Sequence, residues 1–351
     1  MAIHTFWAVP AGALQQYPGF RNSVNMSPDD LLYLDKEARV WLEPSSSSDP
    51  IYRDSSQEWQ AICMRYIAPA AAAASAASLP LHKWNVGFQW QRTSQPLHFF
   101  SESQIDFFDE NGWVVLENAV SPGVVEQLIA ETDRAEREGE EKLRQMRGRR
   151  AFIARADEIT FTTHLVNRSP FMRKFYGSQL FRDIGHDLIG PDVRLYWDQA
   201  VYKKPGVSKP FPWHQDNGYT FVEPQAYLTC WIGLNEANQD NGCMWFVPGV
   251  HKLGTIFHEL TDIGYACYKT NPPEAAPVPT APGTVIVMSS LTPHMTGGNS
   301  TNTTRRALVA QFVPDGAVAV TEDAWGKIER TPADRPDRQF KILEHNRIVE
   351  I

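Results

Sequence analysis

Three residues of this chain have the types and the spacing to hold a transition metal together. His214 and Asp216 stand two positions apart, and on a β-strand residues i and i+2 point to the same face. A third ligand would complete the 2-His-1-carboxylate set that leaves positions open on non-heme Fe(II). His294, which follows a β-rich run 80 residues after His214, is the candidate. The order of these residues predicts a metal site.

Two adjacent arginines, Arg305 and Arg306, open a strand-like run eleven residues after His294. A guanidinium stays charged when it is buried and can meet a carboxylate through two parallel hydrogen bonds. One of the two is therefore a candidate anchor for an anionic ligand. Because neighbouring strand residues point to opposite faces, only one can face the interior of a barrel. The residues alone leave that choice open.

The elements that must position these residues change in type along the chain. Helix signals occupy residues 101–112, where Ser101 and Gln104 form a capping box, and residues 121–144 and 169–190, each opened by a Ser-Pro pair. From Val193 onward, short strand-like runs alternate with Pro, Gly and Asn turns, which is typical of an antiparallel jelly roll. We predict a mainly β fold with flanking α-helices, built on a double-stranded β-helix (jelly-roll, cupin-like) barrel.

The chain divides into an N-terminal extension of unknown role, residues 1–95, and a barrel domain, residues 96–351. Trp84, Phe88 and Trp90 stand at even spacings, as one face of a strand would, and we expect them to pack on the barrel domain. The extension is expected either to cover the mouth of the barrel or to build a homodimer contact.

Composition and charge narrow the classes of partner. The 351 residues carry a net charge of −8, from 33 basic and 41 acidic residues, which argues against nucleic acid or an anionic membrane as a partner. No apolar run approaches the roughly 18–20 residues that span a bilayer, and no secretory signal opens the chain. The four cysteines lack CxxC spacing, so free thiols in a reducing compartment are expected. We predict a cytoplasmic protein that acts on a small molecule.

Five segments, in this order, resemble the phytanoyl-CoA dioxygenase family of Fe(II)/2-oxoglutarate-dependent oxygenases. They are residues 100–115, 202–206, 213–216, 230–235 with 241–251, and 294–306. The similarity covers roughly residues 96–320, and the first 95 residues match nothing in it. The resemblance is specific for the family and not for the substrate.

This resemblance implies a set of site residues. His214, Asp216 and His294 would be the metal ligands, and the family spacing favours Arg305 over Arg306 as the anchor of the distal carboxylate of 2-oxoglutarate. Three further positions resemble those that border 2-oxoglutarate in the family: Thr296, Gln215 and Trp231. Plain packing in the core or outside the barrel is the competing interpretation of Gln215 and Trp231.

The resemblance also implies an oxidoreductase that uses Fe(II), 2-oxoglutarate as cosubstrate and O2, and that releases succinate and CO2. Because Asp216 is a carboxylate and not the small residue of the family's halogenases, hydroxylation, desaturation or ring formation is expected. The aromatic content favours a ring-bearing specialised metabolite as substrate. Three alternatives remain open: an acyl-CoA hydroxylase of the same family, a non-catalytic metal-binding jelly roll, and a Zn(II) hydrolase.

Several other residues are weaker candidates for the site. Tyr219 is a candidate for substrate contact, and His164 a lesser one. Lys203 and Lys204 would meet an acidic substrate if they faced the site, although solvated loop lysines are the default expectation. His251 and His258 are expected to be structural.

Overall fold

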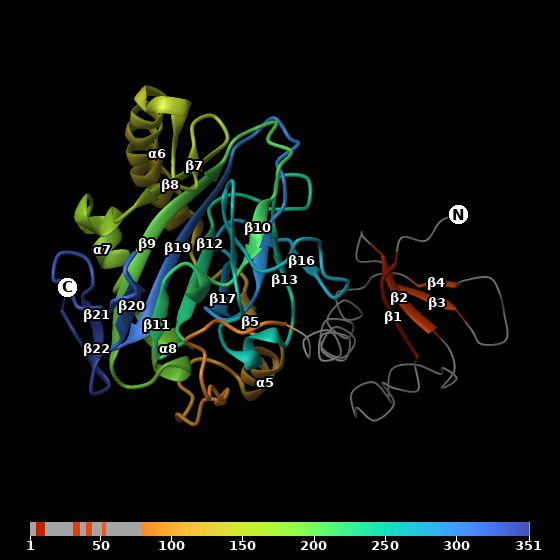
Figure 1. Ribbon diagram of the computed structural model, residues 1–351, viewed down its shortest axis with the longest axis horizontal. Helices are drawn as coiled ribbons and strands as arrows, with labels where there is room; N and C mark the ends of the chain where they lie inside the picture. Colours follow the sequence, from red (N-terminus) through yellow and green to blue (C-terminus); the bar gives the residue numbers. More distant parts are fainter. Residues whose placement is uncertain (1–4, 11–30, 36–39, 44–50, 54–78, 351) are drawn as a thin grey trace.

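The computed structural model describes residues 5–10, 31–35, 40–43, 51–53 and 79–350. Two sheets form the barrel, and α-helices lie outside them (Figure 1). The predicted jelly-roll fold with flanking helices is confirmed. Residues 5–53 contribute a separate antiparallel sheet of β1 (Thr5–Pro10), β2 (Leu31–Asp35), β3 (Val40–Glu43) and β4 (Ile51–Arg53).

The major sheet carries one wall of the barrel and the strand that begins with Arg305. Its strands pair antiparallel in the order β5 (Trp113–Leu116), β17 (Val285–Ser289), β12 (Leu228–Gly233), β19 (Arg305–Pro314), β9 (Val193–Lys203), β8 (Ile159–Thr163), β7 (Ala154–Arg155) and β6 (Arg150–Ala151). At its edge β22 (Lys341–Glu344) pairs with β9, and β23 (Arg347–Ile348) pairs with β22.

The minor sheet faces it and carries two of the predicted metal ligands. Its order is β10 (Phe211–His214), β18 (His294–Thr296), β13 (Met244–Phe246) and β16 (Ala276–Val278). His214 and His294 are cross-strand partners in the β10–β18 pair. Cross-strand partners lie side by side on one face of a sheet, so this register brings together two residues that are 80 positions apart in sequence.

The alternation of side chains along the major sheet separates two hydrophobic cores. On β19, Ala307 and Val309 face the barrel core that holds Trp213, whereas Leu308 and Phe312 face the core under the helices. Every second residue of a strand shares a face. This alternation places Arg305 on the barrel side and Arg306 on the helix side.

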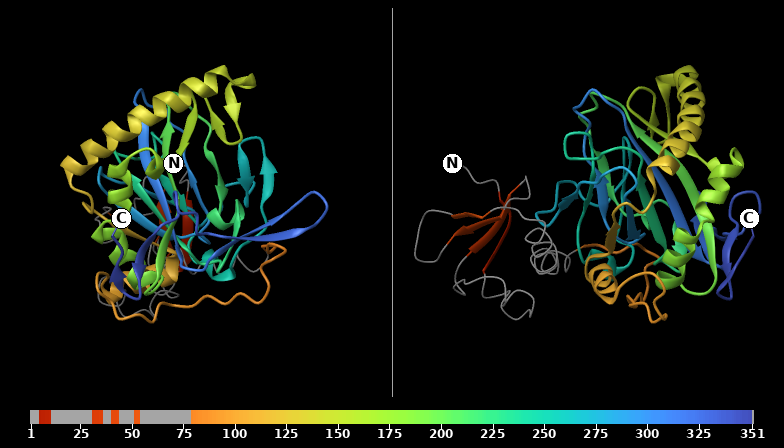
Figure 2. Two further views of the ribbon diagram at one scale, coloured as in Figure 1. Left: turned by 90° about the vertical axis from the view of Figure 1, so that its left-hand side faces the viewer. Right: turned by 180° about the vertical axis from the view of Figure 1, so that it is seen from behind.

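Within residues 79–350, four α-helices flank the sheets: α5 (Glu102–Asn111), α6 (Pro122–Gln145), α7 (Pro170–Tyr176) and α8 (Gln179–Leu188). Figure 2 shows α6, in yellow, running across the face of the major sheet. The capping box of Ser101 and Gln104 is present, and α5 ends at Gly112 with φ 94°. A Cβ at Gly112 would lie 2.7 Å from His251 Nδ1, so only glycine fits this turn.

One helix prediction is wrong in part. The segment predicted as a single helix over 169–190 is divided into α7 and α8, because Gly177 caps the first helix and Ser178 precedes the second. Among the described helices, none combines the length and the apolar composition that crossing a membrane requires.

Residues 79–95 are packed on the barrel without forming the predicted strand. The Asn85 side chain donates to the carbonyls of Leu253 and Thr255 at 2.8 and 2.9 Å. Trp90 packs edge-on against His251 with ring centroids 4.4 Å apart. The expected packing of this segment on the barrel is therefore found.

Smaller elements complete the structure near the barrel ends. A three-stranded sheet is formed by β11 (Phe221–Glu223), β20 (Val318–Glu322) and β21 (Ile328–Pro332), and a hairpin by β14 (Glu259–Thr261) and β15 (Gly264–Ala266). Short 3-10 turns cover Arg147–Arg149, Leu165–Asn167, Asp216–Gly218 and Val250–Leu253.

Candidate metal and cosubstrate site

The three predicted ligands lie together inside the barrel. Asp216 Oδ1 is 3.8 Å from His214 Nε2 and also 3.8 Å from His294 Nε2. One donor atom from each residue lies within 4.8 Å of the others. Metal bonds of about 2.0–2.2 Å require donors roughly 3–4 Å apart, so one ion can reach all three atoms.

Backbone carbonyls fix the orientation of both imidazoles. His214 Nδ1 lies 2.8 Å from the carbonyl of Pro212, and His294 Nδ1 lies 2.9 Å from that of Thr292. An Nδ1–H that donates to a carbonyl leaves Nε2 unprotonated and free to bind a metal. Burial, followed by the neighbouring His294, lowers the pKa of His214 well below its usual value. This imidazole is therefore neutral, as ligation requires.

Thr229 on β12 holds the carboxylate ligand. Its hydroxyl donates to Asp216 Oδ2, which leaves Oδ1 facing the two imidazoles. The arrangement matches a monodentate carboxylate. No pattern in the sequence pointed to Thr229, because its contact depends on how β12 lies beside the turn at Asp216.

The Gln215 side chain is held by backbone groups. Its amide donates to the carbonyls of Gly254 and Leu291 at 3.0 and 2.5 Å and accepts from the N–H of Ile256 at 2.8 Å. These bonds use both N–H groups and the oxygen, so the side chain has no free donor for a cosubstrate. Gln215 ties the ligand loop to residues 254–256, as a side chain that packs in the core would, and its contact with the cosubstrate stays a prediction.

His258 supports the same loop and is structural, as expected. Its Nδ1 lies 2.9 Å from the carbonyl of Ile256, and its Nε2 accepts from the backbone N–H of Gln215 at 2.9 Å. Burial lowers the pKa of His258 to about 4. A neutral imidazole thus holds the peptide between His214 and Asp216 in place.

Arg305 and Arg306 point to opposite sides of the major sheet. Arg306 bonds Asp133 of α6 through Nε at 2.9 Å. Arg305 is fully buried, and none of its three guanidinium nitrogens has a hydrogen-bond partner among the described residues. Burial lowers the pKa of Arg305 to about 10, so the group is charged at neutral pH. A buried, charged and unpartnered guanidinium is costly unless an anion joins it.

Thr296 and Trp231 lie in the neighbourhood of Arg305. The guanidinium carbon of Arg305 is 5.8 Å from the centre of the Trp231 ring. Thr296 stands two residues after His294 on β18, and its hydroxyl accepts from Lys203 Nζ at 3.0 Å. Lys203 is the cross-strand partner of Arg305. Trp231 also packs in the barrel core, and its contact with 2-oxoglutarate stays a prediction.

The two lysines differ from the solvated loop residues that were expected. Lys203 ends β9 and is 1% exposed inside the barrel. Lys204 points to the helix side, where its ammonium pairs with Glu136 and, at 3.0 Å, with Glu140. Lys204 is therefore engaged away from the site. The burial of Lys203 depends on its register with Arg305, which the sequence pattern does not reveal.

Tyr219 lies beside the first metal ligand, and His164 does not. The Tyr219 ring is 5.2 Å from the His214 ring and edge-on to it, and burial raises the pKa of the Tyr219 hydroxyl. His164 follows Thr163, at the opposite end of β8 from Ile159, the residue that pairs with Lys203. His164 packs on Trp197 instead.

The residues of this site fit both Fe(II) and 2-oxoglutarate. The two free Nε2 atoms and one carboxylate oxygen form a donor set suited to Fe(II). The unpartnered guanidinium of Arg305 fits the distal carboxylate of 2-oxoglutarate. The two sites are linked through Thr296, which stands on the strand of His294 and bonds Lys203 beside Arg305.

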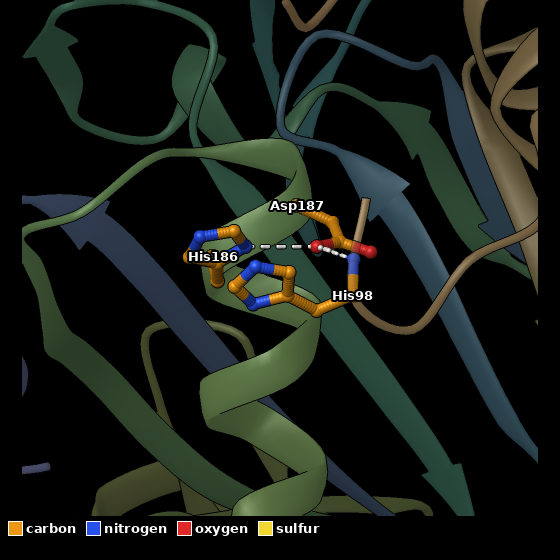
Figure 3. A group of neighbouring side chains, drawn as sticks. All are labelled: His98, His186 and Asp187. Atoms are coloured by element: carbon orange, nitrogen blue, oxygen red, sulfur yellow. Dashed lines mark hydrogen bonds and ion pairs between the residues drawn. The ribbon is translucent and has the colours of Figure 1, made fainter. Parts of the chain in front are cut away.

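A second His/Asp cluster lies outside the barrel, between residues 98–100 and α8 (Figure 3). Asp187 accepts from the backbone N–H groups of His98, Phe99 and Phe100 and pairs with His186 Nδ1, each at 2.9 Å. Burial alone would raise the pKa of Asp187, but these hydrogen bonds hold it below its usual value. The imidazoles of His98 and His186 stack in parallel at 3.7 Å, so their lone pairs do not converge on one ion. The cluster anchors the chain on α8.

Comparisons with known proteins place the chain in one family. The model of the phytanoyl-CoA dioxygenase (PhyH) family matches residues 108–307. A phytanoyl-CoA dioxygenase of Arabidopsis thaliana is 24% identical over 172 residues, which are 48% of this chain and 60% of that protein. A methylphosphonate hydroxylase of Gimesia maris is 31% identical over 134 residues, 37% of this chain and 49% of the relative. The matches thus span less than two thirds of either relative.

Solved structures share the fold. The non-heme α-ketoglutarate-dependent carbocyclase SnoK from nogalamycin biosynthesis gives a TM-score of 0.51 at 21% identity, with 63% of this chain and 87% of that chain covered. EvdO2 from Micromonospora carbonacea, complexed with 2-oxoglutarate, gives a TM-score of 0.50 at 23% identity, with 69% and 98% covered. At this level of identity the likeness concerns the fold alone.

Proposed function

Because the chain belongs to the phytanoyl-CoA dioxygenase family, we propose that it is an Fe(II)/2-oxoglutarate-dependent dioxygenase. It oxidises an unactivated C–H bond of a small organic molecule and releases succinate and CO2. The observation that carries this proposal is the pairing of the three-donor cluster of His214, Asp216 and His294 with a buried, unpartnered guanidinium on the facing sheet.

Each proposed site residue has a separate task. His214, Asp216 and His294 would hold Fe(II), since two imidazoles and one carboxylate are a donor set suited to it. Arg305 binds the distal carboxylate of 2-oxoglutarate, and the Thr296 hydroxyl helps to hold it. When bound, Fe(II) with 2-oxoglutarate and O2 supplies the oxidising chemistry. The protein supplies orientation and a site that is closed to bulk water by Trp231 and the rest of the barrel core.

The substrate is proposed to be a ring-bearing specialised metabolite that binds beside Tyr219. Relatives in the family carry names as different as methylphosphonate hydroxylase and ectoine dioxygenase, so membership does not select a substrate. Support comes from the rings next to His214. Tyr219, Tyr265 and Phe152 lie with centroids 5.4–6.4 Å apart, and Phe152 is 63% exposed. Aromatic side chains favour flat apolar partners.

Two hairpins carry Phe152 and Tyr265, the two rings that lie beside Tyr219. Phe152 is at the tip of the β6–β7 hairpin, and Tyr265 belongs to the β14–β15 hairpin. Arg150 and Arg155 of the first hairpin both bond Asp262 of the second.

Phe152→Ala is expected to raise the substrate KM roughly tenfold, the effect of losing about 1.4 kcal/mol of ring contact, while binding of 2-oxoglutarate is unchanged. An unaltered KM would place the substrate elsewhere.

Succinate formation tests the proposed reaction. The purified protein, loaded with Fe(II) and supplied with 2-oxoglutarate in air, should produce succinate, and pooled ring-bearing metabolites should accelerate it. A chelator and the variant Asp216→Ala are the controls and should abolish the product. Iron retention without succinate would indicate a non-catalytic binding module. Acceleration by acyl-CoA esters alone would keep the reaction and replace the substrate.

A further inference from the structure

Two buried cations stand side by side on the inner face of the major sheet. Lys203 of β9 and Arg305 of β19 are directly paired across the strands, and such partners point to the same face. Val201 and Ala307, two residues from each, lie in the barrel core, so that face looks into the barrel. Lys203 is 1% exposed and Arg305 is fully buried.

No carboxylate of the described residues neutralises either cation. The ion pairs within residues 79–350 include neither Lys203 nor Arg305, whereas the neighbouring Lys204 and Arg306 each have an acidic partner on α6. Cys243 lies near both cations, but burial raises the pKa of its thiol to about 12, so it carries no charge at neutral pH. Burial, followed by the charge of Arg305, lowers the pKa of Lys203 well below its usual value. An anionic ligand beside the two groups would offset both effects and favour the ammonium form of Lys203.

The ammonium of Lys203 acts through Thr296. Lys203 Nζ donates to the Thr296 carbonyl at 3.2 Å, to the Thr296 hydroxyl oxygen at 3.0 Å, and to the carbonyl of Gly297. These three bonds use all three protons of the ammonium. Because the Thr296 oxygen already accepts from Lys203, its own proton is left to be donated to a ligand. Lys203 thus sets the direction in which that hydroxyl donates.

The chain makes room for this lysine at Gly242. Gly242 has φ +90°, and a Cβ there would lie 3.2 Å from Lys203 Cδ and 2.6 Å from the carbonyl of Gly297. Any larger residue would push the lysine stem away from Thr296. The contact between Lys203 and Thr296 thus depends on the ends of β9 and β18 and on the turn before β13.

We infer that Lys203 is a positioning residue of the cosubstrate site, which aims the Thr296 hydroxyl and adds a second positive charge beside Arg305. The two cations together select a 2-oxo acid that carries a distal carboxylate. This inference rests on the proposed function and deepens it. It assigns to one of two adjacent lysines a role in cosubstrate selectivity, and to the other only a structural ion pair.

Anaerobic titrations of the Fe(II)-loaded protein with two ligands test the inference. 2-Oxoglutarate carries a distal carboxylate and 2-oxobutanoate does not, and binding of each is followed by visible absorption. Lys203→Met should weaken 2-oxoglutarate binding about 10- to 100-fold, because the Thr296 hydroxyl loses its fixed direction and a positive charge near the distal carboxylate is removed. It should leave the affinities for Fe(II) and 2-oxobutanoate unchanged. Lys203→Arg, which keeps the charge, should recover part of the loss.

Two further variants make the result decisive. Lys203→Gln keeps donors for the Thr296 and Gly297 oxygens without the charge. It replaces Lys203→Met if the latter does not fold, and it should show the part of the loss that comes from the charge. Lys204→Met removes only the pair with Glu136 and Glu140 and should bind 2-oxoglutarate as wild type does.

The ligand-induced rise in melting temperature gives an independent readout. Wild type without metal should be stabilised by 2-oxoglutarate, and the Lys203 variants should be stabilised less. Equal losses for both 2-oxo acids and Fe(II) would show a merely structural lysine, and unchanged binding would show no role; either overturns the inference. Failure of wild type itself to bind 2-oxoglutarate would instead overturn the proposed function.

Discussion

At the scale of single residues, the site depends on which of two neighbours faces inward. His214 and Asp216 could be predicted as a pair from strand periodicity, which relates residues two apart. In the structure, however, β10 ends at His214 and Asp216 begins a 3-10 turn. The same periodicity predicted that only one of Arg305 and Arg306 faces the barrel, but it did not distinguish between them. The structure places Arg305 inside and Arg306 against Asp133. Their assigned roles remain proposals that mutation can separate.

Replacement of each arginine separates those roles. Arg305→Ala should raise the concentration of 2-oxoglutarate required for turnover steeply, since it removes a bidentate charged contact of roughly 2–3 kcal/mol. Arg306→Ala, the matched control, removes the partly exposed pair with Asp133 and the contact with the Tyr202 ring on the helix side, and it should leave that requirement unchanged. Steady-state kinetics in 2-oxoglutarate measures both. The reverse pattern would mean that Arg306 is the anchor.

Two residues show where sequence reasoning ended. The family resemblance placed Gln215 beside the cosubstrate, yet its amide bonds backbone groups of residues 254–256 and 291. Lys203 was expected in solvent because it belongs to a Lys-Lys-Pro-Gly run. Its burial follows from strand register across about 100 residues of sequence, and a local pattern carries no information on such pairing.

At the scale of elements, local signals predicted the helices and long-range contacts decided the rest. The capping box at Ser101 and the end of α5 at Gly112 were predicted because both are signals within four residues. The Gly177-Ser178 break between α7 and α8 was a signal of the same kind that was overlooked. Trp84 and Trp90 pack on the barrel without a strand, because ring contacts to Phe221 and His251 hold them.

His251 connects the 3-10 turn Val250–Leu253 with α5 and with Trp90. We expect its burial to make the stability of the protein sensitive to acid. Its Nε2 donates to the Asp109 carbonyl of α5 at 3.1 Å, and its ring packs on Trp90. Burial, followed by Lys252, lowers the pKa of His251 to about 3. The folded protein keeps this ring neutral, whereas the unfolded chain binds a proton near pH 6.5. The contribution of the neutral His251 ring to the free energy of unfolding is therefore complete above pH 6.5 and is lost as the pH falls toward 3.

Denaturant unfolding at two pH values checks this prediction. Between pH 7 and pH 5 the wild type should lose about 2 kcal/mol of unfolding free energy through His251 alone. His251→Phe keeps a ring against Trp90 but cannot titrate, so its loss over the same interval should be smaller by that amount. Parallel losses in the two proteins would contradict the assignment.

At the scale of the whole molecule, the division into an extension and a barrel domain stays a prediction, but part of the predicted extension packs on the barrel. The expected division at residue 95 followed the start of the family resemblance. The structure shows residues 79–95 packed on the barrel through Asn85 and Trp90, so the extension to be tested ends at residue 78. The proposals that it covers the mouth or joins two copies concern residues 1–78.

Two truncations separate packing from that role. Deletion of residues 1–95 should lower the unfolding free energy by about 3–5 kcal/mol, because it removes the buried contacts of Trp90 and Asn85. Deletion of residues 1–78 should leave that free energy and Fe(II) binding unchanged while substrate turnover falls. Thermal unfolding, metal titration and turnover measure the three quantities. Loss of Fe(II) binding on deleting residues 1–78 would show that the extension supports the metal site itself.

The most direct test of the whole account is anaerobic addition of 2-oxoglutarate to the Fe(II)-loaded protein, followed by visible absorption spectroscopy. We expect a weak charge-transfer band in the wild-type protein. We expect no band in Asp216→Ala, which lacks one of the three donors but should keep its fold. Wild-type protein that binds Fe(II) yet gives no band with 2-oxoglutarate would contradict the assignment of the cosubstrate and of the reaction.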